Sequence, residues 1–261
     1  MFSKLFGTKK KKEDSPILYA TQRSEDYGDW SFISTDIHSH LIPGIDDGAQ
    51  TIEDSISLIE QLRGMGFKSL ITTPHIKSDH FRNNSINITE GLHKLQQSLH
   101  ERNIQMPVKA AAEYYIDDHF MNLLEAGDLL TITDNQVLVE ISFMFEPMRF
   151  SEILFKIQTK AYRPILAHPE RYAFYHNNID AYRELKDRGC YLQLNTISLS
   201  GYYGKGVKHI AEKLLHEKLY DYCGTDMHHA RHAESMQKLL KSGIMPTLQR
   251  YPFLNPKLKL A

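Results

Sequence analysis

From residue 34 onward, short apolar runs alternate with longer segments in which apolar residues recur every three or four positions. The short runs are typical of buried β-strands, and the longer segments are typical of helices with one buried face. A short β-prone run at Phe32 and Ile33 leads into the first strand, and we expect further strands over residues 69–73, 108–112, 138–141, 164–167, 191–195 and 220–224. We expect helices over residues 51–64, 85–103, 149–161, 206–218, 232–242 and 245–251, and one that ends at Gly189.

The segment after residue 50 shows how local signals support these predictions. Thr51 is suited to cap a helix, and Asp54 stands three residues later, where a capping box places an acidic side chain. An apolar stripe follows along the helix, and Gly64 and Gly66 mark its end.

The alternation of strands and helices predicts an α/β fold. Seven strand–helix units, with spacings suited to parallel crossovers, indicate a closed or nearly closed β/α barrel. In such barrels the functional side chains lie at the carboxyl ends of the strands.

Composition fits one globular domain at residues 31–261, since 41% of the 261 residues are hydrophobic. Residues 1–30 read as a tail that carries the basic run Lys9–Lys12, and weak contact of this run with anionic lipid is the alternative to a merely solvated tail. The sequence has no apolar run of membrane-spanning length, no signal-peptide core and only two cysteines. We therefore expect a cytoplasmic protein.

Charge argues against a nucleic-acid partner, because 31 basic and 32 acidic residues leave a net charge of −1. The chain has 14 histidines, and histidine is the commonest metal ligand in proteins. The positions of these histidines therefore bear on function.

Polar, ionisable residues stand where the predicted strands end. His38 and His40 alternate with Ser39, so in an extended chain both imidazoles point to one face. Similar positions are occupied by His75, Glu113, Glu140, His168, Asp226 and His228. One such residue is easily a satisfied core group, but the whole set is costly to bury unless it is paired or bound to metal. The pattern predicts a metal centre at one end of the barrel.

Six motifs in order resemble the PHP (polymerase and histidinol phosphatase) superfamily over about residues 34–255. They are residues 36–40, 46–48, 73–75, 112–115, 167–172 and 225–228. Within it the chain is most similar to bacterial manganese-dependent tyrosine-protein phosphatases of capsule and exopolysaccharide biosynthesis. The resemblance implies a distorted (β/α)7 barrel, the TIM-like PHP fold, with a trinuclear metal centre.

The resemblance also implies ligand roles, residue by residue. His38, His40, Glu113 and Asp226 would hold one ion, and Glu113 would bridge to a second ion held by Glu140 and His168. Asp46, His75 and His228 would hold a third, with Asp46 preferred to Asp47 because it stands eight residues after His38. Arg171 and Arg231 correspond to arginines that contact phosphate.

The implied activity is hydrolysis of a phosphomonoester, with Mn²⁺ as the first expectation and Zn²⁺, Fe²⁺ or Mg²⁺ as alternatives. A set of imidazoles and carboxylates without thiolate suits such ions. The implied substrate is a phosphotyrosine-containing protein, such as a capsule-associated tyrosine kinase. The open alternatives are another phosphoesterase of the superfamily, such as histidinol-phosphate phosphatase, or a non-catalytic metal-binding module.

A cysteine-dependent phosphatase is excluded, because it needs arginine six residues after the nucleophilic cysteine. Thr196 follows Cys190 at that distance, and His229 follows Cys223. Tyr202 and Tyr203 are either part of a substrate-facing loop or ordinary surface residues.

Overall fold

The computed structural model describes residues 28–258 of the chain. Its strands are β1 (Thr35–Asp36), β2 (Ser69–Thr72), β3 (His75–Ile76), β4 (Val108–Ala110), β5 (Glu113–Tyr115), β6 (Gln136–Glu140), β7 (Arg163–Ala167), β8 (Tyr191–Asn195) and β9 (Tyr222–Gly224). Its α-helices are α1 (Ile52–Gly64), α2 (Ser85–Glu101), α3 (Asp118–Ala126), α4 (Phe150–Thr159), α5 (Ile179–Asp187), α6 (Lys205–His216), α7 (Ala230–Leu240) and α8 (Met245–Arg250). Short 3-10 turns are η1 (Trp30–Phe32), η2 (Pro169–Arg171), η3 (Ala173–Tyr175), η4 (Thr196–Ser200) and η5 (Asn255–Lys257).

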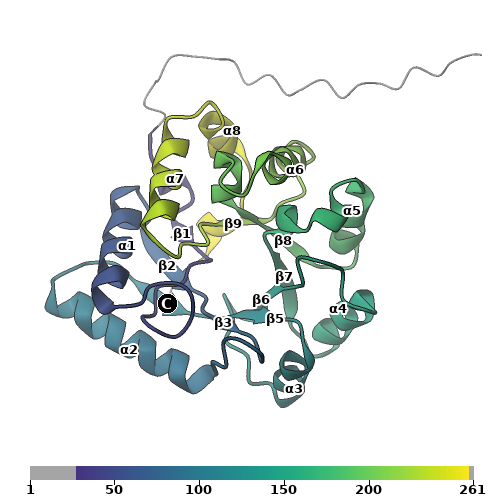
Figure 1. Ribbon diagram of the computed structural model, residues 1–261, viewed down its shortest axis with the longest axis horizontal. Coiled ribbons are helices and arrows are strands. Elements are labelled where there is room, and N and C mark those ends of the chain that lie inside the picture. Colours follow the sequence, from purple (N-terminus) through teal and green to yellow (C-terminus); the bar gives the residue numbers. More distant parts are fainter. Residues whose placement is uncertain (1–27, 259–261) are drawn as a thin grey trace, which may run out of the picture.

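The strands pair in parallel and form the wall of a distorted β/α barrel, with the helices around the outside (Figure 1). One sheet has the order β1-β2-β4 and the other the order β3-β5-β6-β7-β8-β9. Thr73-Pro74 separates β2 from β3, and Ala111-Ala112 separates β4 from β5, so each of these pairs is one strand that changes sheets partway along. In the described residues the nine strand segments therefore occupy seven positions around the barrel, as the sequence predicts.

The first and last positions of the barrel meet beyond the ends of the regular strands. The amide of Asp226 donates to the carbonyl of His38 over 2.7 Å, and the amide of His40 donates to that of Met227 over 2.9 Å. The Asp36 carboxylate accepts from both the amide and the hydroxyl of Thr225, each over 2.8 Å. This joint brings the first and last predicted ligands together.

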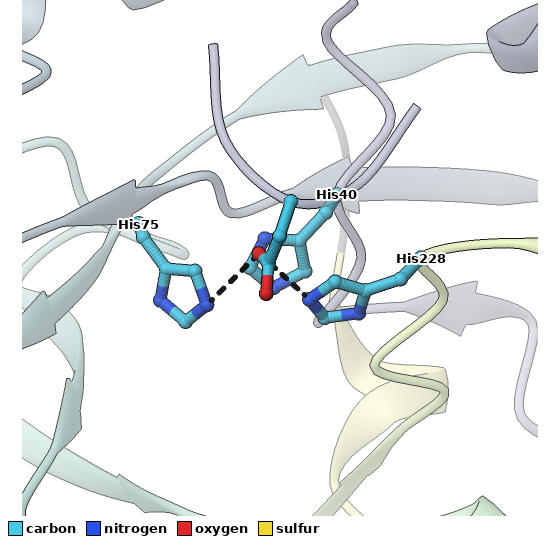
Figure 2. A group of neighbouring side chains, drawn as sticks. His40, His75 and His228 are labelled. Atoms are coloured by element: carbon cyan, nitrogen blue, oxygen red, sulfur yellow. Dashed lines mark ion pairs between the residues drawn. The ribbon is translucent and has the colours of Figure 1, made fainter. Parts of the chain in front are cut away.

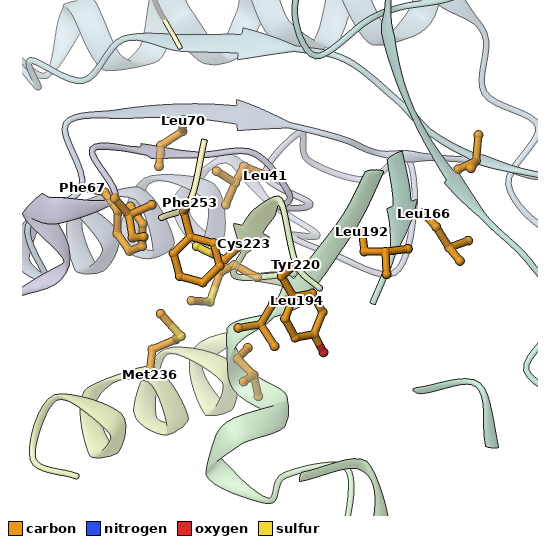
Figure 3. Close-up of a cluster of buried hydrophobic side chains, with 14 of the residues drawn as sticks. Leu41, Phe67, Leu70, Leu166, Leu192, Leu194, Tyr220, Cys223, Met236 and Phe253 are labelled. Atoms are coloured by element: carbon orange, nitrogen blue, oxygen red, sulfur yellow. The ribbon is translucent and has the colours of Figure 1, made fainter. Parts of the chain in front are cut away.

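Burial of apolar side chains between the strands and the surrounding helices holds the barrel together. Leu166 on β7 and Leu192 and Leu194 on β8 belong to one buried apolar cluster with Met236 of α7 (Figure 3). Helix α1 begins as predicted, because Thr51 accepts from the amide of Asp54 and the Asp54 side chain accepts from the amide of Thr51. This capping box sets the direction in which α1 leaves the loop before it.

Three local predictions need correction. The run at Phe32 and Ile33 belongs to the turn η1 and its C-cap, not to a strand, and β1 begins at Thr35. Helix α3 was not predicted, although Asp117 caps its start and left-handed Gly127 ends it. Trp30, assigned to the tail, is fully buried, so the folded domain begins slightly before residue 31.

Most of the predicted tail, including the basic run Lys9–Lys12, lies outside the described residues. Within residues 28–258, none of the helices has both the length and the apolar character needed to cross a bilayer.

Candidate metal centre

A cavity of about 350 Å³ opens at the carboxyl ends of the strands. Its walls include six of the predicted ligands: His75, Glu113, Glu140, His168, Asp226 and His228. His38 and His40 lie beneath them and are fully buried. The structure therefore brings together side chains that are up to 190 positions apart in the sequence, from His38 to His228.

His38 and His40 face the same side of the chain, as the alternation predicts, although β1 ends at Asp36. Their Nε2 atoms are 3.4 Å apart. Two glycines permit this packing: a Cβ on Gly48 would meet the Cβ of His40 at 2.3 Å, and one on Gly224 would meet the Cβ of His38 at 2.5 Å. Any larger residue at either position would displace one of these histidines.

Glu113 lies at the centre of the cluster and is fully buried. Its Oε2 is 3.2 Å from His38 Nε2, 3.5 Å from His40 Nε2 and 3.1 Å from His75 Nδ1. Its Oε1 is 3.1 Å from His168 Nε2. One carboxylate thus faces four imidazoles: two from the segment after β1, one from β3 and one from the residue that follows β7.

Hydrogen bonds behind the imidazoles fix which nitrogen faces the cavity. His38 Nδ1 is 2.9 Å from Gln193 Oε1, and His40 Nδ1 is 2.7 Å from Asp46 Oδ2. His228 Nδ1 is 2.9 Å from the carbonyl oxygen of Asp226. Each acceptor holds the proton on Nδ1, which leaves the Nε2 lone pair directed into the cluster, as in metal-binding histidines.

A second group forms where His40, His75 and His228 converge (Figure 2). The carboxylate among them belongs to Asp47, whose Oδ1 is 3.6 Å from His75 Nε2 and 3.3 Å from His228 Nε2. Asp46 instead lies behind His40, and it also accepts from the amides of Gly48 and His75. The geometry therefore favours Asp47 over the predicted Asp46 as the ligand in this group.

Two further groups surround Glu113. His38 and His40 meet Asp226, whose Oδ1 is 3.3 Å from His38 Nε2 and 3.5 Å from His40 Nε2. On the other side, His168 Nε2 is 3.6 Å from Glu140 Oε1. The donor atoms that lie close together here fall into three groups: His38, Glu113 and His168; His38, His40 and Asp226; and His75, Glu113 and Glu140.

The electrostatics of the cluster show how strongly its groups interact. Burial lowers the pKa of His38, but the carboxylates of Glu113 and Asp226 outweigh it and raise that pKa to about 9. Burial would raise the pKa of Glu113, yet the charge of His38 and the other imidazoles hold it well below its usual range. The buried imidazole of His38 and the carboxylate of Glu113 thus stabilise each other's charged form.

Other groups of the cluster shift in the opposite direction. Burial lowers the pKa of both His75 and His168 to about 4, and the Arg171 charge adds to the effect at His168. Burial and the nearby Glu113 carboxylate raise the pKa of Glu140 well above its usual range. Neutral imidazoles offer lone pairs, and crowded carboxylates gain from a cation between them.

The donor set fits divalent cations. Within the described residues, Glu113 Oε2, His75 Nδ1 and His168 Nδ1 are buried without a hydrogen bond of acceptable geometry. Four sets of imidazole and carboxylate atoms each lie within 4.8 Å of one another. Such nitrogen and oxygen donors suit Mn²⁺, Fe²⁺, Zn²⁺ or Mg²⁺.

His168 and Asp226 both have left-handed backbone conformations, with φ of 35° and 50°. Residues other than glycine rarely adopt this region, and those that do often lie at functional sites. His168 is the first residue after β7, and Asp226 is the second residue after β9. In each case the left-handed turn directs the side chain into the cavity.

Arg171 lies at the wall of the cavity and does not pair with Glu170. Its Nη1 donates to Asp226 Oδ2 over 3.0 Å, and its guanidinium lies between the rings of Phe143 and Tyr203, 4.6 and 4.3 Å from their centres. Tyr203, whose role the sequence left open, therefore lines the site. Arg231 is exposed on α7 and is not one of the residues that line the cavity.

Sequence reasoning missed several groups around the centre. Gln193 and Asn195 occupy alternate positions in β8, and Asn195 Nδ2 donates to Asp226 Oδ2 over 2.8 Å. Their polar side chains, two apart in an apolar strand, were a usable signal. Lys77, which also lines the cavity, stands two residues after His75 and could have been found in the same way.

The family model for capsular polysaccharide synthesis, CpsB/CapC, matches residues 34–243. The chain is 28% identical to the tyrosine-protein phosphatase YwqE of Bacillus subtilis, over 75% of this chain and 78% of that protein. It is 29% identical to the tyrosine-protein phosphatase CpsB of Streptococcus pneumoniae, over 74% of this chain and 82% of that protein. It is also similar to a crystal structure from a study of these two proteins, described as metal-dependent tyrosine phosphatases. The TM-score is 0.74 at 25% identity, covering 85% of this chain and 90% of that chain.

Proposed function

Because the chain belongs to the CpsB/CapC family of capsular polysaccharide synthesis, we propose that it is a metal-dependent protein-tyrosine phosphatase. The observation that carries the proposal is the convergence of imidazoles and carboxylates around Glu113, with the Arg171 guanidinium beside them. Phosphate ester hydrolysis of this kind needs divalent cations and an oriented positive charge. The imidazoles and carboxylates of the site are ligands for the cations, and the Arg171 guanidinium is the oriented charge.

The proposed centre holds up to three divalent ions. His38, His40 and Asp226 bind one together with Glu113, and Glu113, Glu140 and His168 bind the second. The third is bound by Asp47, His75 and His228, with Asp46 orienting His40 from behind. Mn²⁺ is the proposed native ion, and Zn²⁺, Fe²⁺ and Mg²⁺ are the alternatives to be compared with it. When bound, clustered divalent ions lower the pKa of water and neutralise phosphoryl oxygens.

Arg171 is the proposed phosphate-binding residue. Its guanidinium is held between two aromatic rings and tied to Asp226, so it is already oriented before substrate binds. The planar fork suits two phosphoryl oxygens at once, and the developing charge strengthens this contact in the transition state. A tyrosine leaving group, with a pKa near 10, needs less help from an acid than an alkoxide does. Arg231, exposed on α7, is the second candidate for the same role.

The proposed substrate is phosphotyrosine on a protein, in particular a tyrosine kinase of the capsule machinery in the cytoplasm. The basic run Lys9–Lys12 would add a weak contact with anionic lipid. Histidinol phosphate is the main alternative substrate, because the same ligands serve any phosphomonoester.

One assay tests the proposal. Protein stripped of metal by exhaustive chelation is given Mn²⁺, Zn²⁺, Fe²⁺ or Mg²⁺ in turn, and phosphotyrosine peptide, phosphoserine peptide and histidinol phosphate are compared side by side. We expect no turnover without metal, and recovery with Mn²⁺ on the phosphotyrosine peptide. Full activity of the stripped protein would overturn the metal-dependent mechanism, and preference for histidinol phosphate would replace the proposed substrate. Metal binding without turnover of any phosphomonoester would favour the non-catalytic module.

A further inference from the structure

The loop that follows β6, residues 142–148, exposes a group of large apolar side chains, and we name it the rim loop. Met144, Phe145 and Met148 are 81%, 65% and 89% exposed, and Phe143 is 40% exposed. These four are the majority of the large apolar residues that the described chain exposes, and they lie within six consecutive positions. Clustered apolar exposure of this kind marks an interaction surface more often than a neutral one.

The rim loop is anchored at several points, so its apolar side chains point outward from a fixed base. At its start the amide of Ile141 donates to the Tyr172 hydroxyl over 3.2 Å. In its middle the Tyr175 hydroxyl donates to the Glu146 carboxylate. At its end Phe150 is buried. Between these anchors Met144, Phe145 and Met148 stay mostly exposed in the described structure.

The rim loop is continuous with the metal centre. Phe143 lines the cavity, lies against the Arg171 guanidinium and stacks on His168 with ring centres 5.6 Å apart. A residue bound in the cavity through its phosphate would therefore have the rim loop along one side of its backbone. The neighbouring residues of that ligand are the groups most able to cover Met144, Phe145 and Met148.

We propose that the rim loop binds apolar side chains next to the phosphotyrosine of a polypeptide substrate. The inference rests on the proposed phosphatase function and adds a sequence preference to it. Apolar neighbours would bury the exposed methionine and phenylalanine side chains on binding, whereas polar neighbours would leave them in water. Flexible methionines adapt to apolar partners of different shape, so the preference is for apolar character and not for one sequence.

The charges around the rim loop favour a polypeptide over a lipid surface. A membrane-inserting loop is usually flanked by lysines or arginines that contact anionic headgroups. Here Arg149 pairs with Glu152, and Lys156 and Lys160 both pair with Glu125. Each of these three basic side chains therefore already pairs with a carboxylate, and the two lysines share one.

The test compares two phosphotyrosine peptides and an aryl phosphate on the Mn²⁺-loaded protein. One peptide carries apolar residues on both sides of the phosphotyrosine, and the other carries serine and glycine. The test variant combines Met144→Ser, Phe145→Ser and Met148→Ser, none of which is placed in the catalytic machinery. The matched control is Phe155→Ser, which removes an equally exposed phenylalanine, 68% exposed, from α4.

We expect wild type to prefer the apolar peptide, mainly through KM. The triple variant should lose about tenfold in kcat/KM on that peptide, in line with the loss of apolar contacts in a binding site. On the aryl phosphate and the polar peptide, kcat/KM of the triple variant should stay within about twofold of wild type. The control Phe155→Ser should stay within about twofold of wild type on all three substrates. Equal activity of wild type and triple variant on the apolar peptide would overturn the inference while leaving the phosphatase function intact.

Two further outcomes would also overturn it. In the first, wild type binds vesicles of phosphatidylserine and phosphatidylcholine and the triple variant does not, while the two have the same kcat/KM on both peptides. The second is loss of a wild-type dimer in the triple variant with unchanged peptide kinetics. Failure to hydrolyse any phosphotyrosine substrate, the aryl phosphate included, would instead refute the proposed function.

Discussion

Glu113 and Glu170 are both fully buried carboxylates, but they lie in opposite surroundings. Glu170 accepts from the amide of Asn195 over 3.0 Å, the hydroxyl of Ser198 over 2.7 Å and the hydroxyl of Tyr220 over 2.9 Å. Glu113 faces imidazole nitrogens, and its Oε2 has no hydrogen bond of acceptable geometry among the described residues.

The difference separates a carboxylate that fixed donors satisfy from one that lacks such donors. Neutral donors fixed by the fold satisfy Glu170 completely, so it can tie η2 to β8 and η4 without any ion. The nitrogens around Glu113 can act as acceptors as readily as donors, and they crowd one oxygen at 3.1–3.5 Å. Burial alone therefore does not identify a metal ligand; the kind of neighbour does.

The largest expected effect is that of Glu113→Gln. The substitution keeps the shape but removes the charge between the proposed ions, so kcat/KM on an aryl phosphate should fall on the order of 10³-fold. Bound metal, measured by elemental analysis, should fall as well. Glu170→Gln is the matched control and should keep its metal. Full metal content and near-wild-type rates in Glu113→Gln would remove the contrast between the two carboxylates.

Arg171→Ala should cost on the order of 10²–10³ in kcat/KM, the usual loss of an oriented charged donor. Arg171→Lys should restore only part of the rate, since an ammonium lacks the planar fork. Metal content and melting temperature should change little. Arg231→Ala, which removes an exposed guanidinium from α7, tests the second candidate in the same assay. If both alanine variants lose less than about threefold, neither arginine serves phosphate.

Asp47 and Asp46 sharpen the comparison within one loop. Asp47→Asn should remove a ligand of the His75–His228 group and lower bound metal together with rate. Asp46→Asn should act through His40, with about 10–100-fold loss of metal affinity that excess Mn²⁺ recovers. Metal titration of both variants by calorimetry decides between them, and the reverse pattern would make Asp46 the ligand.

The smallest effect concerns pH and Glu170. Burial raises the pKa of Glu170 to about 7 in the folded protein, although its three hydrogen-bond donors act to lower it. In the unfolded chain the pKa is near 4.5. The folded state therefore binds the extra proton, and this contribution to stability is complete below pH 4.5 and is lost as pH rises through 7. Relative to Glu170→Gln, wild type should lose stability between pH 5 and 8 in urea unfolding. A pH-independent difference would show that Glu170 is ionised throughout.

Sequence patterns were sufficient for most of the framework. The capping box of α1 and the run of β8 were predicted at their observed positions, because each depends on residues close in sequence. Helix α3 was missed even though Asp117 and Gly127 mark its ends, since the segment stands between two strand predictions and its apolar stripe is short. The two strands that change sheets could not be predicted, because that bend depends on packing around the whole barrel.

At the site, the motifs predicted which side chains converge, but not which of them face one another. Asp46 and Asp47 are adjacent, and only the loop conformation decides which one faces His75 and His228. Nor does any local pattern connect Phe143 and Tyr203 with Arg171, because the three residues come from separate loops.

The joint between the first and last barrel positions has a consequence for synthesis on the ribosome. Asp36 and Thr225 are 189 residues apart, and their contact holds His38 against Asp226. A nascent chain has completed six ligand-bearing segments before Asp226 is made. Until then, His38 and His40 lack the Asp226 carboxylate that they contact in the folded protein. Tight metal binding should therefore appear only after residue 228 has left the exit tunnel, late in translation.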